Sequence, residues 1–307
     1  RELGDAVREA RFVADLGLFH YWRGRNEEAQ VCYQEALDKF EELGERTRVV
    51  QILHRLGYIA DDEDNYVKAR ELYERSLVIS KELGNSALIS RSRHLVGVVA
   101  YHEGAYTEAR QCLEQTLEEV SSKDSVADIN RTKRRLAGVA RMQGHYASQA
   151  EEQGHYFNEA RRLLGEVLKT EKNWRSRARA LRQLGMVEQE EGKIGKALKH
   201  FQQSVDLFEK LGNRKGISSV KYNLASVALA RDNVERAEQL GRQSLKMTRE
   251  LKCRYGEALT LRLLARIALR RGNQRQAEAL LRQAIQVLEE IESPHIREFR
   301  ELLDQWE

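Results

Sequence analysis

The sequence of 307 residues has very little proline and cysteine: one proline, Pro294, and three cysteines, Cys32, Cys112 and Cys253. Because proline interrupts helices, its near absence allows long helices along almost the whole chain. The cysteines are far apart and odd in number, which argues against a disulfide framework and predicts free thiols in a reducing, cytoplasmic compartment. Aromatic residues make up only 7% and charged residues 33%, a balance typical of exposed helices rather than of a thick globular core.

Long apolar runs are also lacking. The longest are only a few residues, too short for a transmembrane helix or the core of a signal peptide, so we expect a soluble chain with no membrane partner. The chain starts RELGDAVREA, without an initiator methionine, and we expect it to be a fragment of a longer protein. The formal net charge of +4 is too small to identify a partner, so the positions of the charges matter more than their sum.

Motifs of catalysis and cofactor binding are absent as well. The stretch GNRKGISS at 212–219 lacks the spacing of a phosphate-binding loop, and neither H-E-x-x-H nor G-x-S-x-G occurs. His54 and His94 are one repeat apart and His102 follows eight residues later, but no thiol or carboxylate has metal-ligand spacing around all three. We therefore expect no enzyme activity, no cofactor and no metal.

A 40-residue period is the main feature that the sequence does contain. In each repeat an apolar residue precedes a small one, and in all but the fourth repeat an alanine lies twelve residues after the small residue. The pairs are Leu16-Gly17, Leu56-Gly57, Val96-Gly97, Leu136-Ala137, Leu184-Gly185, Leu224-Ala225 and Leu264-Ala265, with one step of 48 before Leu184. Between the two halves lie Gly, Asp or Asn residues, which suit a tight turn, and apolar residues recur at helical spacing. Each repeat is therefore predicted to be a pair of antiparallel helices that stacks on its neighbours.

These residues resemble the tetratricopeptide repeat (TPR). The family's pattern is met by Val96, Gly97, Gly104, Tyr106, Ala109 and Leu113, and again by Leu56, Gly57, Tyr66, Ala69 and Tyr73. The resemblance implies an all-α fold, a right-handed superhelical solenoid of about seven antiparallel helix pairs plus a C-terminal capping helix. The longer, proline-free repeats resemble the C-terminal TPR sensor regions of bacterial STAND and MalT-like signal-transduction ATPases.

We expect one solenoid over residues 1–307. The predicted repeats are about 5–44, 45–84, 85–124, 125–172, 173–212, 213–252 and 253–292, with an insertion near 144–156 in the fourth. A cap helix is predicted at 294–306, with Ser293 as its N-cap and Pro294 at the first helical position.

In TPR arrays the first helices of successive repeats line the concave face, so the resemblance implies a groove formed by five positions of each first helix. Of these 35 positions, ten are arginine, none is lysine, and three, Asp61, Asp62 and Glu190, are acidic. Arginine holds a carboxylate or phosphate with two hydrogen bonds and stacks on aromatic rings. The predicted groove residues are Arg11, Tyr21, Trp22, His54, Tyr58, Arg91, His94, Tyr101, Arg131, Arg134, Arg141, Arg179, Arg182, Tyr222, Asn223, Arg262, Arg266 and Arg270.

We expect this groove to bind a protein or peptide, in particular an acidic segment, so that the chain is a non-catalytic interaction scaffold or the ligand-sensing part of a larger regulator. Binding of a nucleic-acid strand to the same basic groove is one alternative, although no recognised nucleic-acid module is present. A purely structural array that spaces or oligomerises the parent protein is another. Pairing of the arginines with acids on neighbouring helices would make the groove less basic than this count implies.

The stretch MQGHYASQAEEQGHYFNEA at 142–160 contains Gly-His-Tyr twice, starting at Gly144 and at Gly154. It lies where the fourth repeat should turn, and the alanine of its second helix, Ala160, comes eleven residues late. A paired-histidine site is not expected, because ten residues along a helix separate His145 from His155 by about 15 Å. We predict a duplicated turn that lengthens one helix by about three turns, with the second copy as the working turn.

Overall fold

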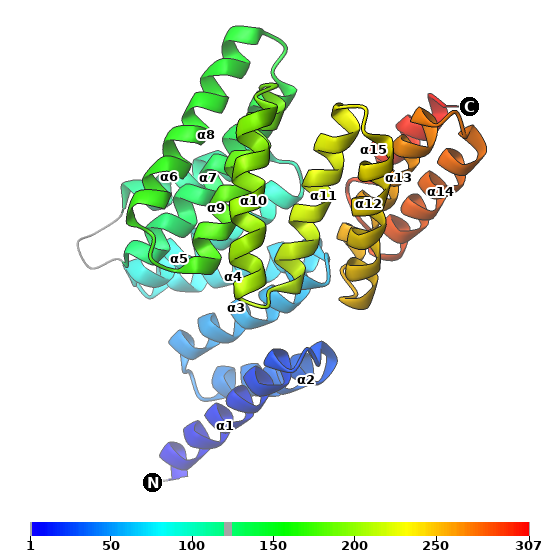
Figure 1. The fold of residues 1–307 in the computed structure, drawn as a ribbon. Helices are drawn as coiled ribbons and strands as arrows, with labels where there is room; N and C mark the ends of the chain where they lie inside the picture. The colour runs from blue at the N-terminus through cyan, green and yellow to red at the C-terminus, as the bar shows by residue number, and fades with distance from the viewer. Residues whose placement is uncertain (1, 120–124, 307) are drawn as a thin grey trace. The chain divides into compact units, whose positions relative to one another are not determined.

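The structure, a computed structural model, describes residues 2–119 and 125–306 (Figure 1). These two ranges contain fifteen α-helices and no strand, which confirms the all-α fold class. None of the helices described is long and apolar enough to cross a membrane. Contacts between residues divide the chain into two compact units, Arg1–Ser122 (unit 1) and Lys123–Glu307 (unit 2).

Unit 1 consists of three antiparallel helix pairs. Their helices are α1 (Glu2–Trp22), α2 (Asn26–Glu42), α3 (Arg46–Asp62), α4 (Tyr66–Glu82), α5 (Ser86–His102) and α6 (Tyr106–Glu118). Within unit 1, each helix packs on its neighbours along the chain, from α1 on α2 to α5 on α6. The pair α3 and α4 shows how the period arises, because two helices of 17 residues and two connections of three residues add up to 40.

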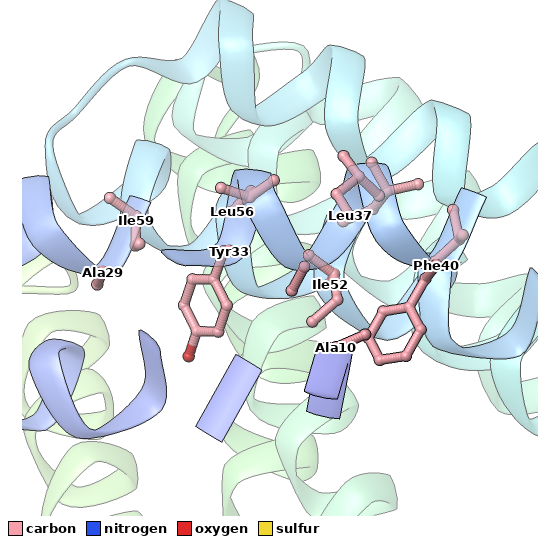
Figure 2. Packing of buried hydrophobic residues seen from close by; sticks show 11 residues of the cluster. Ala10, Ala29, Tyr33, Leu37, Phe40, Ile52, Leu56 and Ile59 are labelled. Atoms are coloured by element: carbon pink, nitrogen blue, oxygen red, sulfur yellow. The ribbon is translucent and has the colours of Figure 1, made fainter. Parts of the chain in front are cut away.

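The small residue of each repeat allows the two helices of a pair to approach closely. Gly17 in α1 lies so near the Tyr33 ring in α2 that a Cβ atom on it would be 2.9 Å from Tyr33 Cδ1. Gly57 in α3 lies against Tyr73 in α4 in the same way. Figure 2 shows Tyr33 within a cluster of buried hydrophobic residues, beside side chains of α3. The recurrence of a glycine and an aromatic residue sixteen positions later therefore reflects helix packing.

One face of α1 is apolar and exposed. Phe12, Leu16 and Phe19 keep 70%, 39% and 47% of their surface accessible. The residues one period later, Ile52, Leu56 and Ile59 in α3, are buried in the cluster that α2 covers. Within the described residues of unit 1, α1 thus lacks the covering helix that α3 has in α2.

Unit 2 contains four helix pairs and a final single helix. The helices are α7 (Val126–Tyr146), α8 (Ala150–Thr170), α9 (Trp174–Glu190), α10 (Ile194–Lys210), α11 (Arg214–Ala230), α12 (Val234–Glu250), α13 (Arg254–Arg270), α14 (Gln274–Glu290) and α15 (Ile296–Asp304). The turns inside the last three pairs each place one residue in the left-handed region, for example Gly192 with φ of 73° or Asp232 with φ of 58°, as the Gly and Asp residues of the repeat predict.

The doubled Gly-His-Tyr stretch does not form a turn in either copy, which corrects the prediction. The connection is Ala147–Gln149, between the copies; the first copy ends α7 and the second lies inside α8. Both helices have 21 residues instead of 17, so the insertion lengthens both partners of the hairpin rather than one helix. In Figure 1, α8 extends beyond α10. A lengthened hairpin is the better solution, because each new turn of one helix finds a partner on the other.

The last helix begins later than predicted. Helix α15 starts at Ile296 after His295, not at Pro294, and the Ser293 hydroxyl accepts a 3.4 Å hydrogen bond from the His295 backbone amide. Phe299 and Leu303 of α15 are buried in the cluster formed with α13 and α14. The helix therefore closes the apolar face of the last pair in unit 2.

Candidate functional site

In unit 1, the first helices of the three pairs share a cleft of about 360 Å³. Of the predicted groove residues, Arg11 in α1, His54 in α3 and Arg91 in α5 line it. The complete lining is Arg11, Ala14, Asp15, Leu18, Tyr33, Phe40, Arg48, Gln51, Ile52, His54, Arg55, Leu88 and Arg91. The lining thus contains four arginines, one carboxylate (that of Asp15) and several apolar side chains. Such a cleft suits a ligand that carries both negative charge and apolar groups.

His54 in this cleft is a buried, neutral histidine. Its Nε2 lies 2.8 Å from Ser92 Oγ and 3.1 Å from Ser76 Oγ, and only 2% of the residue is exposed. Burial, followed by repulsion from Arg91 and Arg55, lowers the pKa of His54 to about 3. The side chain thus ties α3 to α4 and α5 and adds no positive charge to the cleft near neutral pH.

None of the predicted aromatic residues of unit 1 lines this cleft, although Tyr58 contacts Arg91, which does. Tyr21 donates a 2.6 Å hydrogen bond to Asp62, and burial together with this contact raises the pKa of Tyr21. Tyr101 packs edge-on against His102, which stacks on Tyr66 with ring centroids 5.1 Å apart. Of the remaining predicted residues, Trp22 is 77% exposed, His94 is buried, and the Tyr58 hydroxyl accepts a 3.4 Å hydrogen bond from Arg91. The rings therefore mostly join helices rather than alternate with the arginines along one cleft.

In unit 2 the first helices form a continuous row, because α7 contacts α9, α9 contacts α11 and α11 contacts α13. At the turn end of α7, the buried Arg141 forms an ion pair with Glu190 of α9, and His145 lies 3.9 Å from the same carboxylate. Arg141 is therefore a link between helices rather than a ligand group open to a partner.

Arg134, two turns earlier in α7, is in a different situation. It is only 7% exposed, its Nε has no hydrogen-bond acceptor among the described residues, and no carboxylate pairs with it there. Burial, and then the positive charges of Arg135, Arg179, Arg182 and Arg131, lower the pKa of its guanidinium. Arg131, on the same helix, pairs with Asp128 at 2.7 Å. Basic side chains of α7 and α9 are thus concentrated around one buried guanidinium.

The last pair of unit 2 uses two of its predicted arginines in internal contacts. Arg262 lies over the Phe299 ring of α15, 4.5 Å from its centroid, and 3.9 Å from Glu298. Arg270 pairs with Asp232 at 3.1 Å. Arg266 is exposed, Tyr222 is half-buried and Asn223 is buried. Two of the three predicted arginines of α13 are therefore engaged within unit 2, as Arg131 and Arg141 are in α7.

These ion pairs make the first helices less positively charged than the count of arginines in the sequence predicted. Four of the ten predicted arginines pair with carboxylates: Arg131, Arg141, Arg262 and Arg270. Three of these four carboxylates belong to residues outside the 35 groove positions. Sequence reasoning also missed Arg48 and Arg55, which line the cleft of unit 1. Their spacing from Gln51 and Ile52 along α3 is the signal that would have found them. Over residues 2–119 and 125–306, no group of His, Cys, Asp or Glu side chains could hold a metal ion.

Comparison with known protein families assigns the chain to one of them. The family model of the tetratricopeptide repeat matches residues 10–77, 48–118, 176–250 and 216–290, which together cover more than half of the chain. The chain therefore belongs to the tetratricopeptide repeat family, as the repeat pattern predicted. No curated protein matches it in sequence.

Solved structures with the same fold include a regulator in complex with a peptide. The Rap conjugation gene regulator of plasmid pLS20, in complex with the Phr* peptide, has a TM-score of 0.72 at 14% identity, covering 95% of this chain and 76% of the other. Aspartyl phosphate phosphatase F from Bacillus subtilis has a TM-score of 0.70 at 14% identity, covering 94% and 72%. A STAND protein from Pyrococcus horikoshii with a tetratricopeptide repeat sensor has a TM-score of 0.56 at 12% identity, covering 91% and 41%. At these identities the likeness concerns the fold.

Proposed function

We propose that this chain is a non-catalytic interaction module that binds an acidic peptide or protein segment on its first helices. The observation that carries the proposal is the cleft of unit 1, where Arg11, Arg48, Arg55 and Arg91 face one carboxylate, Asp15. Guanidinium groups hold carboxylates in planar, two-bonded geometry, and the apolar parts of the lining contribute to the burial of neighbouring side chains of the ligand.

The structural neighbours support a peptide as the ligand. The Rap regulator of pLS20 was solved with the Phr* peptide, and another Rap protein was solved with the competence and sporulation factor. A sensor of this fold also occurs within a STAND protein. We extend the proposal accordingly: the chain senses its acidic ligand on behalf of a larger regulatory protein.

Fluorescence anisotropy with a labelled peptide of alternating Asp and Gly, capped at both ends, tests the proposal. The same peptide with Asn in place of Asp is the neutral control. The wild-type protein is expected to bind the acidic peptide in a saturable manner and to bind the Asn peptide much more weakly. Equal binding of the two peptides, or no binding of either, would contradict an acidic ligand.

Paired variants locate the binding in the cleft. The double substitution Arg11→Glu with Arg91→Glu reverses two cleft charges and is expected to abolish binding of the acidic peptide. The control is Arg25→Glu, an exposed arginine in the turn between α1 and α2 that does not line the cleft. If the control and the double variant lose affinity equally, net charge rather than the cleft is responsible.

A further inference from the structure

Three helix pairs are joined by the same ion pair at the end opposite their turn. The first residue of the first helix is an arginine, and the last residue of the second helix, 36 positions later, is a glutamate. The ion pairs are Arg46 with Glu82, Arg214 with Glu250 and Arg254 with Glu290. Their recurrence shows which contact the repeat normally makes where its first helix begins and its second helix ends.

The pair of α9 and α10 departs from this pattern. The equivalent residues are Trp174, the first residue of α9, and Lys210, the last residue of α10. The Lys210 ammonium lies over the Trp174 ring, 5.8 Å from its centroid, near the outer limit of a cation–π contact. Trp174 keeps 53% of its surface accessible. A large aromatic ring is thus open to solvent at a position where the repeat normally has an ion-paired arginine.

Trp174 lines an open cavity of about 480 Å³ in unit 2. Lys169 at the end of α8 and Lys172 in the connection to α9 line it as well, and Leu207 of α10 adds apolar surface. The volume is typical of sites for small molecules. None of these residues is among the 35 positions predicted for the groove, so the cavity is a different site.

The connection between α8 and α9 explains why there is room for the cavity. In the connections α2–α3 and α10–α11, a glycine in the left-handed region, Gly44 with φ of 68° or Gly212 with φ of 60°, follows the second helix. Between α8 and α9 the backbone is extended instead, with φ of −78° and ψ of 122° at Glu171 and φ of −73° and ψ of 118° at Asn173. Extended residues span about twice the length of helical ones, so the end of α8 and the start of α9 lie farther apart.

The cations of the cavity favour a phosphate over a carboxylate. Arg177 Nη1 donates hydrogen bonds of 2.7 Å and 3.0 Å to the carbonyl oxygens of Leu168 and Glu171, so its guanidinium is engaged by the backbone. Lys169 and Lys172 are exposed and pair with no carboxylate among the described residues. A two-bonded grip on a carboxylate needs a free guanidinium, whereas lysine holds phosphate as a compact point charge.

The one acid of the lining does not cancel these positive charges at the cavity surface. Glu171 is only 7% exposed, and its Oε1 accepts a 2.9 Å hydrogen bond from the Asn173 backbone amide. Its carboxylate therefore caps the connection itself. The accessible groups of the cavity are thus an aromatic ring and ammonium groups, which suit a ligand that combines a flat ring with a phosphate.

We propose that this cavity binds a nucleoside monophosphate, with the base stacked on Trp174 and the phosphate held by the lysines of the lining and by Lys210. Every base has a face that stacks on an aromatic side chain. A nucleic-acid strand needs successive stacking side chains and a row of phosphate contacts, but Trp174 is the only aromatic residue of the lining. A single nucleotide therefore fits the cavity better than a strand. The site is independent of the peptide site proposed above.

Three matched ligands test the chemistry of the site by isothermal titration calorimetry. Adenosine 5′-monophosphate (AMP) has both the base and the phosphate, adenosine lacks the phosphate, and ribose 5-phosphate lacks the base. The wild-type protein is expected to bind AMP in a saturable manner and at least about tenfold more tightly than either fragment. Equal affinity for AMP and one of the fragments, or no binding of AMP at millimolar concentration, would overturn the proposal.

A variant that restores the ion pair of the repeat locates the binding. Trp174→Arg with Lys210→Glu is expected to keep a melting temperature at least equal to that of the wild type and to bind AMP at least about tenfold more weakly. The control is Lys199→Glu, an exposed lysine of α10 that does not line the cavity, and it is expected to keep wild-type affinity. Wild-type affinity in the double variant, or an equal loss in the control, would overturn the cavity as the site.

Lys172→Gln provides a second variant that does not depend on the stability of the first. It changes one exposed side chain of the cavity, so it is expected to unfold like the wild type and to bind AMP several-fold more weakly while its affinity for adenosine stays the same. An equal loss of affinity for AMP and adenosine would show that Lys172 does not contact the phosphate, and unchanged affinity for AMP would show the same. Either result would overturn the proposed phosphate contact.

Tryptophan fluorescence tests the stacking directly. AMP is expected to quench the emission of the wild type, whereas ribose 5-phosphate is not, and AMP should leave the emission of Trp22 and Trp306 unchanged in the variant without Trp174. An unchanged emission at saturating AMP would overturn stacking on Trp174. A short oligoadenylate is the last ligand: affinity more than about tenfold above that of AMP would assign the site to a strand and overturn a mononucleotide as its ligand.

Discussion

Gly144 of α7 lies against the ring of Phe157 of α8: a Cβ atom on this glycine would be 2.7 Å from Phe157 Cε1. The contact is the one that Gly17 makes with Tyr33 and Gly185 makes with Phe201, repeated in the lengthened part of the hairpin. The insertion thus continues the packing rule of the repeat. At its second glycine, Gly154, a Cβ atom would have no neighbouring atom within 4 Å, so the two copies of Gly-His-Tyr have different structural roles.

Alanine substitutions at the two glycines should therefore have opposite effects. Gly154→Ala is expected to stabilise the protein by about 0.5–1 kcal/mol, because alanine is favoured over glycine inside a helix. Gly144→Ala is expected to destabilise it by about 1–3 kcal/mol, because the new methyl group overlaps the Phe157 ring. Urea unfolding measures both. Equal stabilisation by the two substitutions would mean that α7 and α8 do not pack as described.

Leu16 and Leu56 are two leucines at the same position of the repeat, so substitutions of the two can be compared directly. Leu56 is 4% exposed in the core of unit 1, and Leu16 is 39% exposed on α1. Leu56→Ala is expected to cost about 2–5 kcal/mol of unfolding free energy. Leu16→Ala should cost about 0.5 kcal/mol or less. If Leu16→Ala cost as much as Leu56→Ala in dilute protein, the free face of α1 would be covered in solution.

Acidification should destabilise unit 1 through His54. Its pKa is lowered to about 3 in the folded protein, by burial first and then by Arg91 and Arg55. The unfolded chain therefore takes up a proton near its ordinary pKa of about 6.5 while the folded protein does not, so stability is lost as the pH falls below that value. At pH 5 the loss from this residue is about 2 kcal/mol.

The variant His54→Gln removes this contribution. Its unfolding free energy between pH 7.5 and pH 5 should fall less than that of the wild type by about the same 2 kcal/mol. The effect is a difference between the two proteins, so the lowered pKa of His200, which acts in the same direction, is present in both. Parallel pH profiles for the two proteins would show that His54 is accessible to protons in the folded state.

The fold was predictable because packing recurs with the sequence. Glycine at position 57 and an aromatic residue at position 73 specify one close helix contact, and the same spacing specifies it again wherever it occurs. The turn of the doubled stretch was not predictable, because Gly144 and Gly154 are equivalent in sequence and only the position of Phe157 distinguishes them. A glycine that looks like a turn residue can also permit close packing within a helix.

The charges of the candidate site were harder to predict than the helices. The repeat places Arg134 and Arg262 at equivalent positions, yet Glu298 that pairs with Arg262 comes from the final helix, outside the repeat pattern. Carboxylates of other helices, such as Glu190 that pairs with Arg141, determine which arginines are engaged in ion pairs. Counting arginines along the first helices therefore did not predict which of them pair with carboxylates.

A competition measurement shows whether the protein prefers an acidic peptide or a nucleic-acid strand as its ligand. The labelled, capped Asp-Gly peptide is bound to the wild-type protein at moderate salt and challenged with unlabelled Asp-Gly peptide, Asn-Gly peptide or single-stranded oligothymidine. We expect displacement by the acidic peptide alone, with affinity that declines as salt rises because the contacts are ionic. Displacement by oligothymidine at lower concentration than by the acidic peptide would contradict it and would make the basic face a nucleic-acid site.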